Sequence, residues 1–392
     1  MVIRKFSFSS TPNIYFGAGS YAKITEIIEK KALSVLIITG VRSFRSSDKW
    51  DKLLDSISLR SVTYYELTVS GEPSPELIDS AVSEFKDKNI DMVVSIGGGS
   101  VIDAGKAISA MLTQNVSVVE FLEGVGTGAS HDGKKIPFIA VPTTAGTGSE
   151  ATKNAVLSRV GNEGFKKSLR HDNFVPDFAV VDPELMISCP PDITAACGMD
   201  AFTQLLESYV SSKANPMTDA LAASGLQYIK NCLVKAYTDG GSLDARTGMA
   251  YASFMSGITL ANAGLGVVHG LASPIGGYFD VPHGVICGSL VGAATHVTID
   301  KLKNQGETGK LFLEQYAKAG ALLTGCNRTD IDYLCDILIK KIDEWSEILH
   351  IPTLSDYGIT SSDYDTIIDG TGNKNNPVNL DREEIRSILQ RC

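Results

Sequence analysis

In the first half of the chain, the pattern of hydrophobic and polar residues defines two kinds of segment that alternate along the sequence. Short runs that are mostly apolar, or that alternate between apolar and polar residues, predict strands at residues 5–9, 13–16, 34–39, 61–66, 91–96, 136–141 and 178–181. Stretches with the spacing of an amphipathic helix lie between several of them, at residues 22–31, 48–56, 76–88 and 101–111. Apolar strands separated by helices predict a parallel sheet with helices on both faces.

The pattern changes after residue 188. Cys189 is followed by two prolines, and from there the apolar spacing is that of helices. Helices are expected at residues 195–211, 217–236, 245–263, 286–298, 309–321, 331–349, 361–370 and 382–389. A chain of 392 residues is long for one core. We therefore predict an α/β domain over residues 1–188 and an all-α domain over residues 189–392.

Composition narrows the class of protein. Hydrophobic residues make up 43% of the chain and charged residues 20%, which is typical of a globular protein. The net charge of −10 argues against nucleic acid as a partner, because phosphates require a basic surface. No run approaches the roughly 20 apolar residues of a membrane span, and the N-terminus lacks the features of a signal peptide. The 7 cysteines form no CxxC pair, so we expect reduced thiols and a cytoplasmic protein.

A glycine-rich loop follows the strand expected at residues 91–96. It consists of Gly97, Gly98, Gly99 and Ser100, and it opens a helix that contains Asp103. Glycines let the backbone approach a ligand closely, and a helix start presents N–H groups suited to a phosphate. The loop therefore predicts a phosphate-binding site, although it is not a GxGxxG fingerprint. The alternative is a tight turn in which the glycines only relieve crowding.

A second loop, rich in hydroxyls, follows the strand expected at residues 136–141. Its Thr143, Thr144 and Thr147 offer neutral donors for pyrophosphate and ribose oxygens. A helix-capping role for Thr147 is the alternative. Open α/β sheets bind ligands at the carboxyl ends of their strands, so two such loops favour a dinucleotide.

The choice between NAD and NADP depends on the strand at residues 34–39. Many NAD enzymes carry an acid after this strand, which holds the ribose 2′-hydroxyl. Here Gly40 follows the strand, and Arg42 and Arg45 lie just beyond it. Gly40 would not repel a 2′-phosphate, and the arginines would attract one. This favours NADP slightly and leaves NAD open.

The helical half carries candidate metal ligands. Asp200 and Gln204 are four residues apart and project from one helix face. His269 and His283 lie in the glycine-rich stretch of residues 264–287. Together they suit Zn²⁺ or Fe²⁺. The alternatives are a helix N-terminal charge for Asp200 and core packing for each histidine.

The order of these segments resembles the metal-dependent, iron-containing (group III) alcohol dehydrogenase family, which is related to glycerol dehydrogenase and dehydroquinate synthase. The similar segments span nearly the whole chain and lie at residues 14–19, 97–100, 142–150, 176–185, 198–201 and 269–283. The resemblance implies an N-terminal dinucleotide-binding α/β domain and a C-terminal all-helical domain. It also implies a homodimer or a larger homo-oligomer.

The resemblance assigns roles residue by residue. It places metal binding and catalysis at Asp200, His269 and His283. It places cofactor contacts on the glycine loop with Asp103, on the three loop threonines and on Lys166. Two positions depart from the family pattern, because Gln204 and Ser273 stand where most members have histidines. With an amide in place of an imidazole, we expect looser metal binding and less preference for Fe²⁺.

We therefore expect an oxidoreductase that transfers a hydride between an alcohol or aldehyde and NAD or NADP. A divalent metal, Fe²⁺ or Zn²⁺, would polarise the substrate oxygen. Without a histidine at position 273, the proton would leave through Ser273, ribose hydroxyls or water. Two alternatives remain: a metal- and NAD-dependent lyase or cyclase of the dehydroquinate synthase type, and a nucleotide-binding homologue with altered chemistry. The sequence does not identify the alcohol.

Overall fold

The computed structural model describes residues 5–161 and 164–392. It divides into two compact units. One is an α/β unit formed by residues 9–159 and 166–189. The other is a helical unit formed by residues 190–392 together with the described residues of ranges 1–8 and 160–165.

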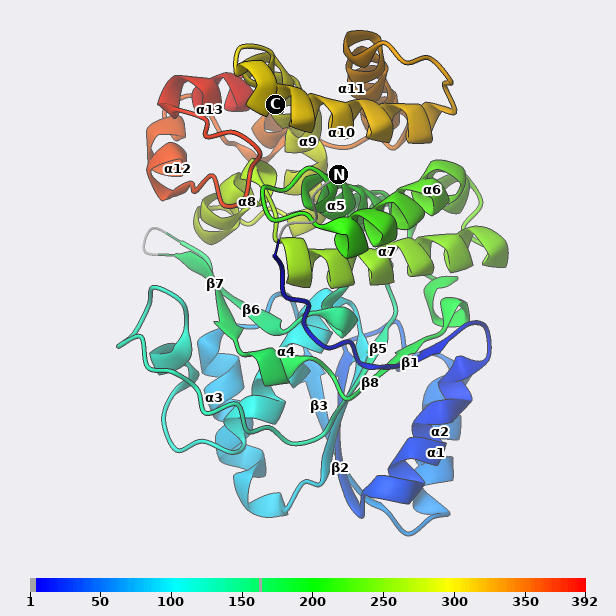
Figure 1. Cartoon of the computed structure of the whole chain (residues 1–392). Helices are drawn as coiled ribbons and strands as arrows, with labels where there is room; N and C mark the ends of the chain where they lie inside the picture. Colours follow the sequence, from blue (N-terminus) through cyan, green and yellow to red (C-terminus); the bar gives the residue numbers. More distant parts are fainter. Residues whose placement is uncertain (1–4, 162–163) are drawn as a thin grey trace. The chain divides into compact units, whose positions relative to one another are not determined.

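The α/β unit is built on a six-stranded sheet in the order β1-β8-β5-β4-β2-β3 (Figure 1). Every pairing in this sheet is parallel, which confirms the predicted sheet. Its strands are β1 (Asn13–Phe16), β2 (Ser34–Gly40), β3 (Thr63–Val69), β4 (Met92–Gly97), β5 (Phe138–Pro142) and β8 (Phe178–Val181). The carboxyl ends of β4 and β5 are adjacent, because Gly97 pairs with Pro142.

Helices cover both faces of this sheet, as Figure 1 shows. They are α1 (Lys23–Lys31), α2 (Asp48–Ser58), α3 (Pro75–Phe85) and α4 (Gly99–Met111). Val94 and Ile96 of β4 join the buried cluster that includes α1 and α2 residues. Ser95 points to the other face, where a Cβ on Gly105 of α4 would lie 1.8 Å from its Oγ. Glycine at position 105 therefore lets α4 pack directly on β4.

Two predictions in this region were wrong. No strand forms at residues 5–9, where Phe6 is 41% exposed, so its alternating pattern marks no buried sheet face. Conversely, β6 (Asn154–Arg159) and β7 (Phe165–Arg170) form a two-stranded sheet that was not predicted. Their sequences are rich in polar residues, so they lack the apolar run that identified the other strands.

The helical unit contains nine α-helices within the described residues. They are α5 (Pro191–Tyr209), α6 (Pro216–Thr238), α7 (Leu243–Ala263), α8 (Val267–Tyr278), α9 (His283–Lys303), α10 (Gly306–Thr324), α11 (Ile331–Ile348), α12 (Tyr364–Gly370) and α13 (Arg382–Leu389). Helix α8 was not predicted, because three glycines and Pro274 lower its helical propensity. Burial of its apolar residues compensates for this. Both candidate histidines thus lie on helices rather than on glycine-rich loops.

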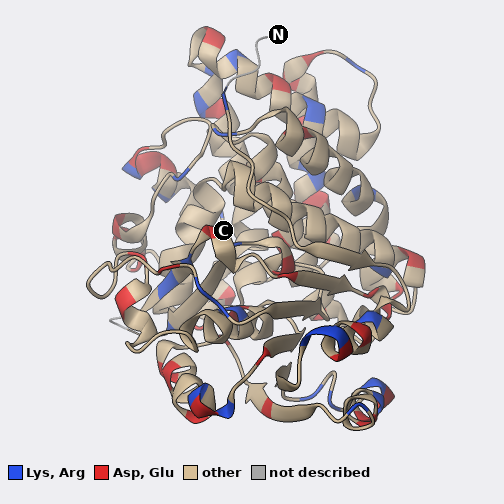
Figure 2. Cartoon of the chain, turned by 60° about the horizontal axis from the view of Figure 1, so that its bottom comes forward, with Lys and Arg blue, Asp and Glu red and all other residues tan. Residues whose placement is uncertain are grey.

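Helix α9 is the central helix of this unit. It packs against α5, α8, α10, α11 and α13. Among the described residues it is long and apolar enough to pass for a membrane span, as is the bent pair α7 and α8. Its apolar stretch is 67% buried inside the protein, which is typical of a core helix. In Figure 2, acidic and basic residues are interspersed along the helices.

Candidate metal and nucleotide sites

Helix α5 presents three polar side chains on one buried face. Asp200, Gln204 and Glu207 follow the i, i+4, i+7 spacing of a helix face. Their residues are only 2%, 2% and 7% exposed. Burying carboxylates is costly unless they are paired, so their partners define the site.

Glu207 connects α5 to the start of α8. Its Oε1 accepts a hydrogen bond from the Val268 N–H at 2.7 Å, and its Oε2 lies 2.7 Å from Nδ1 of His269. A Cβ at Gly266 would lie 2.8 Å from Oε1, so glycine makes room for the carboxylate. A carboxylate is also favoured at the positive end of the α8 dipole. The imidazole of His269 is therefore held with its Nε2 facing Asp200, at 3.3 Å from Oδ1.

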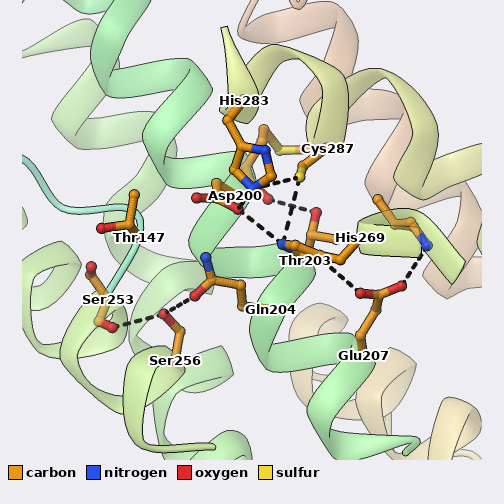
Figure 3. Close-up of polar contacts among 12 residues, drawn as sticks. Thr147, Asp200, Thr203, Gln204, Glu207, Ser253, Ser256, His269, His283 and Cys287 are labelled. Atoms are coloured by element: carbon orange, nitrogen blue, oxygen red, sulfur yellow. Dashed lines mark hydrogen bonds and ion pairs between the residues drawn. The ribbon is translucent and has the colours of Figure 1, made fainter. Parts of the chain in front are cut away.

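Helix α9 brings two further ligand atoms to Asp200. His283 is its first residue, and Nε2 of His283 lies 3.9 Å from Oδ1 of Asp200. Cys287, one turn later, is fully buried, and its Sγ lies 3.6 Å from Nε2 of His269 and 3.8 Å from Nε2 of His283 (Figure 3). A Cβ at Gly284 would lie 2.3 Å from the Ala196 carbonyl oxygen. Glycine there allows α9 to approach α5.

The four side chains fit a metal ion. One ligand atom each of Asp200, His269, His283 and Cys287 lies within 4.8 Å of all the others. Carboxylate oxygen, imidazole nitrogen and thiolate sulfur are all ligands of Zn²⁺ and related divalent ions. Glu207 supplies the outer carboxylate that metal-binding histidines usually have.

Charges in the cluster are strongly coupled. Burial is the largest effect on the pKa of His269 and lowers it, but Cys287, Asp200 and Glu207 together raise that pKa well above its usual value. Burial likewise raises the pKa of Asp200, but its bonds and charge interactions with the two histidines bring the pKa below its usual value. Burial raises the pKa of the Cys287 thiol to about 11. Two carboxylates therefore stabilise positive charge on His269, and a divalent cation could replace the proton on Nε2.

Gln204 lies beside this cluster. Its amide lowers the pKa of the Asp200 carboxyl, and its Oε1 lies 2.8 Å from Oγ of Ser256 on α7. In this orientation the amide oxygen faces α7 rather than the imidazoles. Ser273 is partly buried and lies one turn after His269 on α8.

The two predicted nucleotide loops meet at the edge of the α/β sheet. The Thr143 N–H donates to the Gly97 carbonyl at 2.9 Å. A Cβ on Gly97 would lie 2.6 Å from the Val101 side chain, and one on Gly99 would lie 2.5 Å from Cγ2 of Thr147. Both glycines are thus needed for the loops to pack. Gly98 lies beside Thr144, and Ser100 is in the first turn of α4. The loops form one continuous polar rim.

A buried charge network supports this rim from below. Lys106 is 0% exposed, and its Nζ donates to the Ser149 and Asn154 carbonyls at 2.8 Å and to Oγ1 of Thr152 at 2.9 Å. Asp103 accepts from the Ser149 hydroxyl and, at 3.1 Å, from the Val156 N–H. Both carboxylate oxygens of Asp103 therefore tie α4 to the threonine loop and β6.

Burial shifts several groups of this network. Burial is the main effect that lowers the pKa of Lys106 to about 8 and raises that of Glu150 to about 7. Burial also raises the pKa of Asp103. Lys106 therefore stays mostly charged at neutral pH, with three donors for its oxygen partners.

The remaining nucleotide candidates have separate environments. Lys166, on β7, forms an ion pair with Glu72. Gly40 ends β2, and a Cβ there would lie 3.7 Å from the Val101 side chain. Arg45 is held by Glu66 at 2.8 Å and stacks on the ring of Trp50 at 4.5 Å.

Arg42 is exposed. Both arginines were candidates for binding a 2′-phosphate, but Arg45 already forms an ion pair with Glu66.

Two site residues were missed by sequence reasoning. Glu207 was detectable as a third polar position on the α5 face that carries Asp200 and Gln204. Cys287 follows His283 at i+4, a spacing that places both on one helix face once α9 is known to begin at residue 283. His131, in the α/β unit, is 8% exposed and packs edge-on against Phe121 and Phe174.

Comparison with known proteins gives a consistent result. Residues 11–183 match the family model of iron-containing alcohol dehydrogenase, and residues 194–392 match the C-terminal model of the Fe-containing alcohol dehydrogenase family. The chain is 32% identical to alcohol dehydrogenase 4 of Saccharomyces cerevisiae over 98% of both proteins. It is 33% identical to 1,3-propanediol dehydrogenase of Klebsiella pneumoniae over the full length of both.

A solved structure agrees. The crystal structure of a 1,3-propanediol oxidoreductase matches with a TM-score of 0.88 and 28% identity, covering 99% of this chain and 100% of the other. These full-length matches favour a dehydrogenase over the lyase alternative. The chain therefore belongs to the iron-containing alcohol dehydrogenase family, and it is an NAD(P)-dependent alcohol dehydrogenase.

Proposed function

We propose that Asp200, His269 and His283 hold the divalent metal of this dehydrogenase. The observation that carries the proposal is the convergence of their ligand atoms, together with that of Cys287, within 4.8 Å in a buried pocket of the helical unit. The metal and the nicotinamide, when bound, supply polarisation of the substrate oxygen and the hydride acceptor or donor.

The residues of the chain then have distinct roles. Asp200 supplies negative charge that offsets the cation, and its two imidazole neighbours supply neutral nitrogen donors. Glu207 holds the proton of His269 on Nδ1, which directs Nε2 to the metal position. The substrate proton leaves through Ser273, a ribose hydroxyl or water, since this chain has no histidine at position 273.

We propose that the two loops of the α/β unit hold the pyrophosphate and ribose of NAD or NADP. The glycine loop with Ser100 offers backbone N–H groups at the start of α4, and Thr143, Thr144 and Thr147 offer hydroxyls. Asp103 keeps these loops together. Lys166 is a further candidate contact, and its charge is shared with Glu72. Gly40 leaves space at the end of β2, where Arg42 is the exposed cation available for a 2′-phosphate.

We further propose a cytoplasmic homodimer or larger homo-oligomer. No disulfide forms among the 7 cysteines, all of which lie in the described residues, and this supports a reducing compartment. Strand β1 lies at an edge of the sheet, and its Ile14 and Phe16 are 44% and 38% exposed. An exposed apolar edge strand favours association with another copy. Light scattering after size-exclusion chromatography would test the oligomer.

The proposed division into domains is at residues 188–189. It agrees with the gap between the two family models, which lies at residues 184–193. The compact units also change over at residues 189–190.

The metal proposal is tested by removing and restoring the ion. The purified enzyme is assayed for NADH and NADPH oxidation with a panel of short aldehydes, before and after chelation. We expect activity to disappear with the metal and to return with Zn²⁺ or Fe²⁺. Asp200→Ala should bind neither ion stoichiometrically. Full activity in protein shown by elemental analysis to be metal-free would contradict the proposal.

A further inference from the structure

We infer that the thiolate of Cys287 is the fourth protein ligand of the metal and that Gln204 is not a ligand. The inference rests on the proposed metal site at Asp200, His269 and His283. It changes the ligand set from oxygen and nitrogen alone to one that contains a sulfur.

The interatomic distances carry the inference. Around a tetrahedral Zn²⁺ with bonds of about 2.0–2.1 Å to oxygen or nitrogen and about 2.3 Å to sulfur, ligand atoms are about 3.3 Å apart for O···N and about 3.6 Å apart for S···N. Asp200 Oδ1 lies 3.3 Å from His269 Nε2, and Cys287 Sγ lies 3.6 and 3.8 Å from the two imidazole nitrogens. The distance from Asp200 Oδ1 to His283 Nε2 is 3.9 Å. Three of these four interatomic distances are within about 0.2 Å of the tetrahedral values.

The surroundings of Cys287 differ from those of an ordinary buried cysteine. A free cysteine in a core usually behaves as a small hydrophobic residue. Cys335 of α11 is an example in the same unit, since it is 0% exposed and its Sγ lies 3.7 Å from the Leu313 carbonyl oxygen. The Cys287 sulfur instead faces two imidazole nitrogens that are themselves candidate ligands. These two cysteines therefore form a matched pair for experiment.

Gln204 is directed elsewhere by its neighbours. Its amide lowers the pKa of the Asp200 carboxyl, and its oxygen is 2.8 Å from the Ser256 hydroxyl. That hydroxyl also lies 2.7 Å from the Ser253 carbonyl oxygen, and it has only one hydrogen to donate. By donating this hydrogen to the Gln204 oxygen, Ser256 anchors the amide of Gln204 on the α7 side. Gln204 thus orients Asp200 from outside the ligand set.

A sulfur ligand has a definite chemical consequence. As the metal–sulfur bond forms, the S–H bond breaks and its proton passes to solvent, so the site gains one negative charge. Thiolate ligands favour Zn²⁺ over harder ions, and Zn²⁺ already exceeds Fe²⁺ in general affinity. The ligand set of one carboxylate, two imidazoles and one thiolate therefore selects Zn²⁺ over Fe²⁺.

Zinc X-ray absorption on the full-length chain tests the inference. The metal-free protein is loaded with one equivalent of Zn²⁺, and the zinc ligand shell is measured. We expect one sulfur at about 2.3 Å in the wild type. This sulfur should be lost in Cys287→Ala and Cys287→Ser and retained in Cys335→Ala and Gln204→Ala.

Zinc affinities, from competition with a chromophoric chelator, give a second readout. Cys287→Ala should weaken zinc binding by more than about 100-fold, whereas Gln204→Ala should have the 10- to 100-fold effect of an outer partner. Circular dichroism of the metal-free variants checks their fold, and the wild-type spectrum is decisive even if a variant does not fold.

Two results would overturn the inference. One is a wild-type zinc shell of nitrogen and oxygen only, and the other is a sulfur shell that persists in Cys287→Ala. Either result with stoichiometric zinc leaves the proposed metal site intact. Unchanged zinc binding by Asp200→Ala would instead refute the metal site itself.

Discussion

Replacing Glu207 by Gln tests the outer carboxylate of the proposed metal site. The substitution keeps the shape of the side chain and removes its charge. Glu207 accepts two hydrogen bonds, from Val268 N–H and from His269 Nδ1, both at 2.7 Å. In Gln one of the two oxygens becomes an NH₂ group. When Nε2 of His269 binds the metal, Nδ1 carries the proton, so one N–H donor then faces another donor, whichever way the amide is turned.

The magnitude follows from these contacts. A hydrogen bond to a charged group is worth about 1.5–3 kcal/mol, and the residue is only 7% exposed, so water cannot replace the lost acceptor. This range corresponds to about a 10- to 100-fold change in an equilibrium constant. It equals the effect usually seen when an outer partner of a metal-binding histidine is removed. We therefore expect Glu207→Gln to weaken zinc binding by about 10- to 100-fold.

The assay is competition for Zn²⁺ between the protein and a chromophoric chelator at fixed pH. The exposed Glu347 of α11 provides the control, because Glu347→Gln makes the same chemical change outside the cluster. We expect Glu347→Gln to bind zinc as the wild type does. A Glu207→Gln affinity within twofold of the wild type would refute the role assigned to this carboxylate.

Three predictions concern the nucleotide loops. Gly99→Ala places a Cβ 2.5 Å from Cγ2 of Thr147, so the affinity for NADH and NADPH, measured by fluorescence titration, should fall at least about tenfold. Gly372→Ala is the control, because a Cβ there meets no atom within 4 Å. Unchanged affinity in Gly99→Ala would show that this contact does not constrain the loops. Lys106→Met leaves buried oxygens without their cation and should lower the free energy of unfolding by about 3–5 kcal/mol, measured with denaturant, and an unchanged midpoint would count against the network. Glu150 has its pKa raised from 4.5 to about 7 by burial, so its contribution to stability is present below pH 4.5 and is lost as pH rises through 7. At about 1.4 kcal/mol per pH unit, Glu150→Gln should gain about 3 kcal/mol relative to the wild type between pH 4.5 and 7, and a difference independent of pH would disprove this.

The fold class and the two candidate nucleotide loops could be predicted from the amino-acid sequence. Apolar runs and helical spacing are local properties, so they located the six parallel strands and most helices. The carboxyl ends of parallel strands share one edge, which is why Gly97 and Thr143 could be expected to meet. Local pattern failed at residues 5–9 and in α8. At residues 5–9 an alternating pattern has no buried face, and in α8 burial outweighs the poor propensity of glycine and proline.

Which side chains complete the candidate metal site depends on tertiary packing. Asp200, His269 and His283 could be selected from the sequence through their resemblance to a known pattern. The approach of Cys287 to both imidazoles depends on how α5, α8 and α9 pack, and glycine at position 284 lets α9 approach α5. The direction of the Gln204 amide depends on α7. The ion pair of Arg45 with Glu66 and its stacking on Trp50 likewise depend on segments that the sequence does not place together. Residue type and spacing fix what a side chain can bind, but which atoms share a pocket is fixed by contacts between segments far apart in the chain.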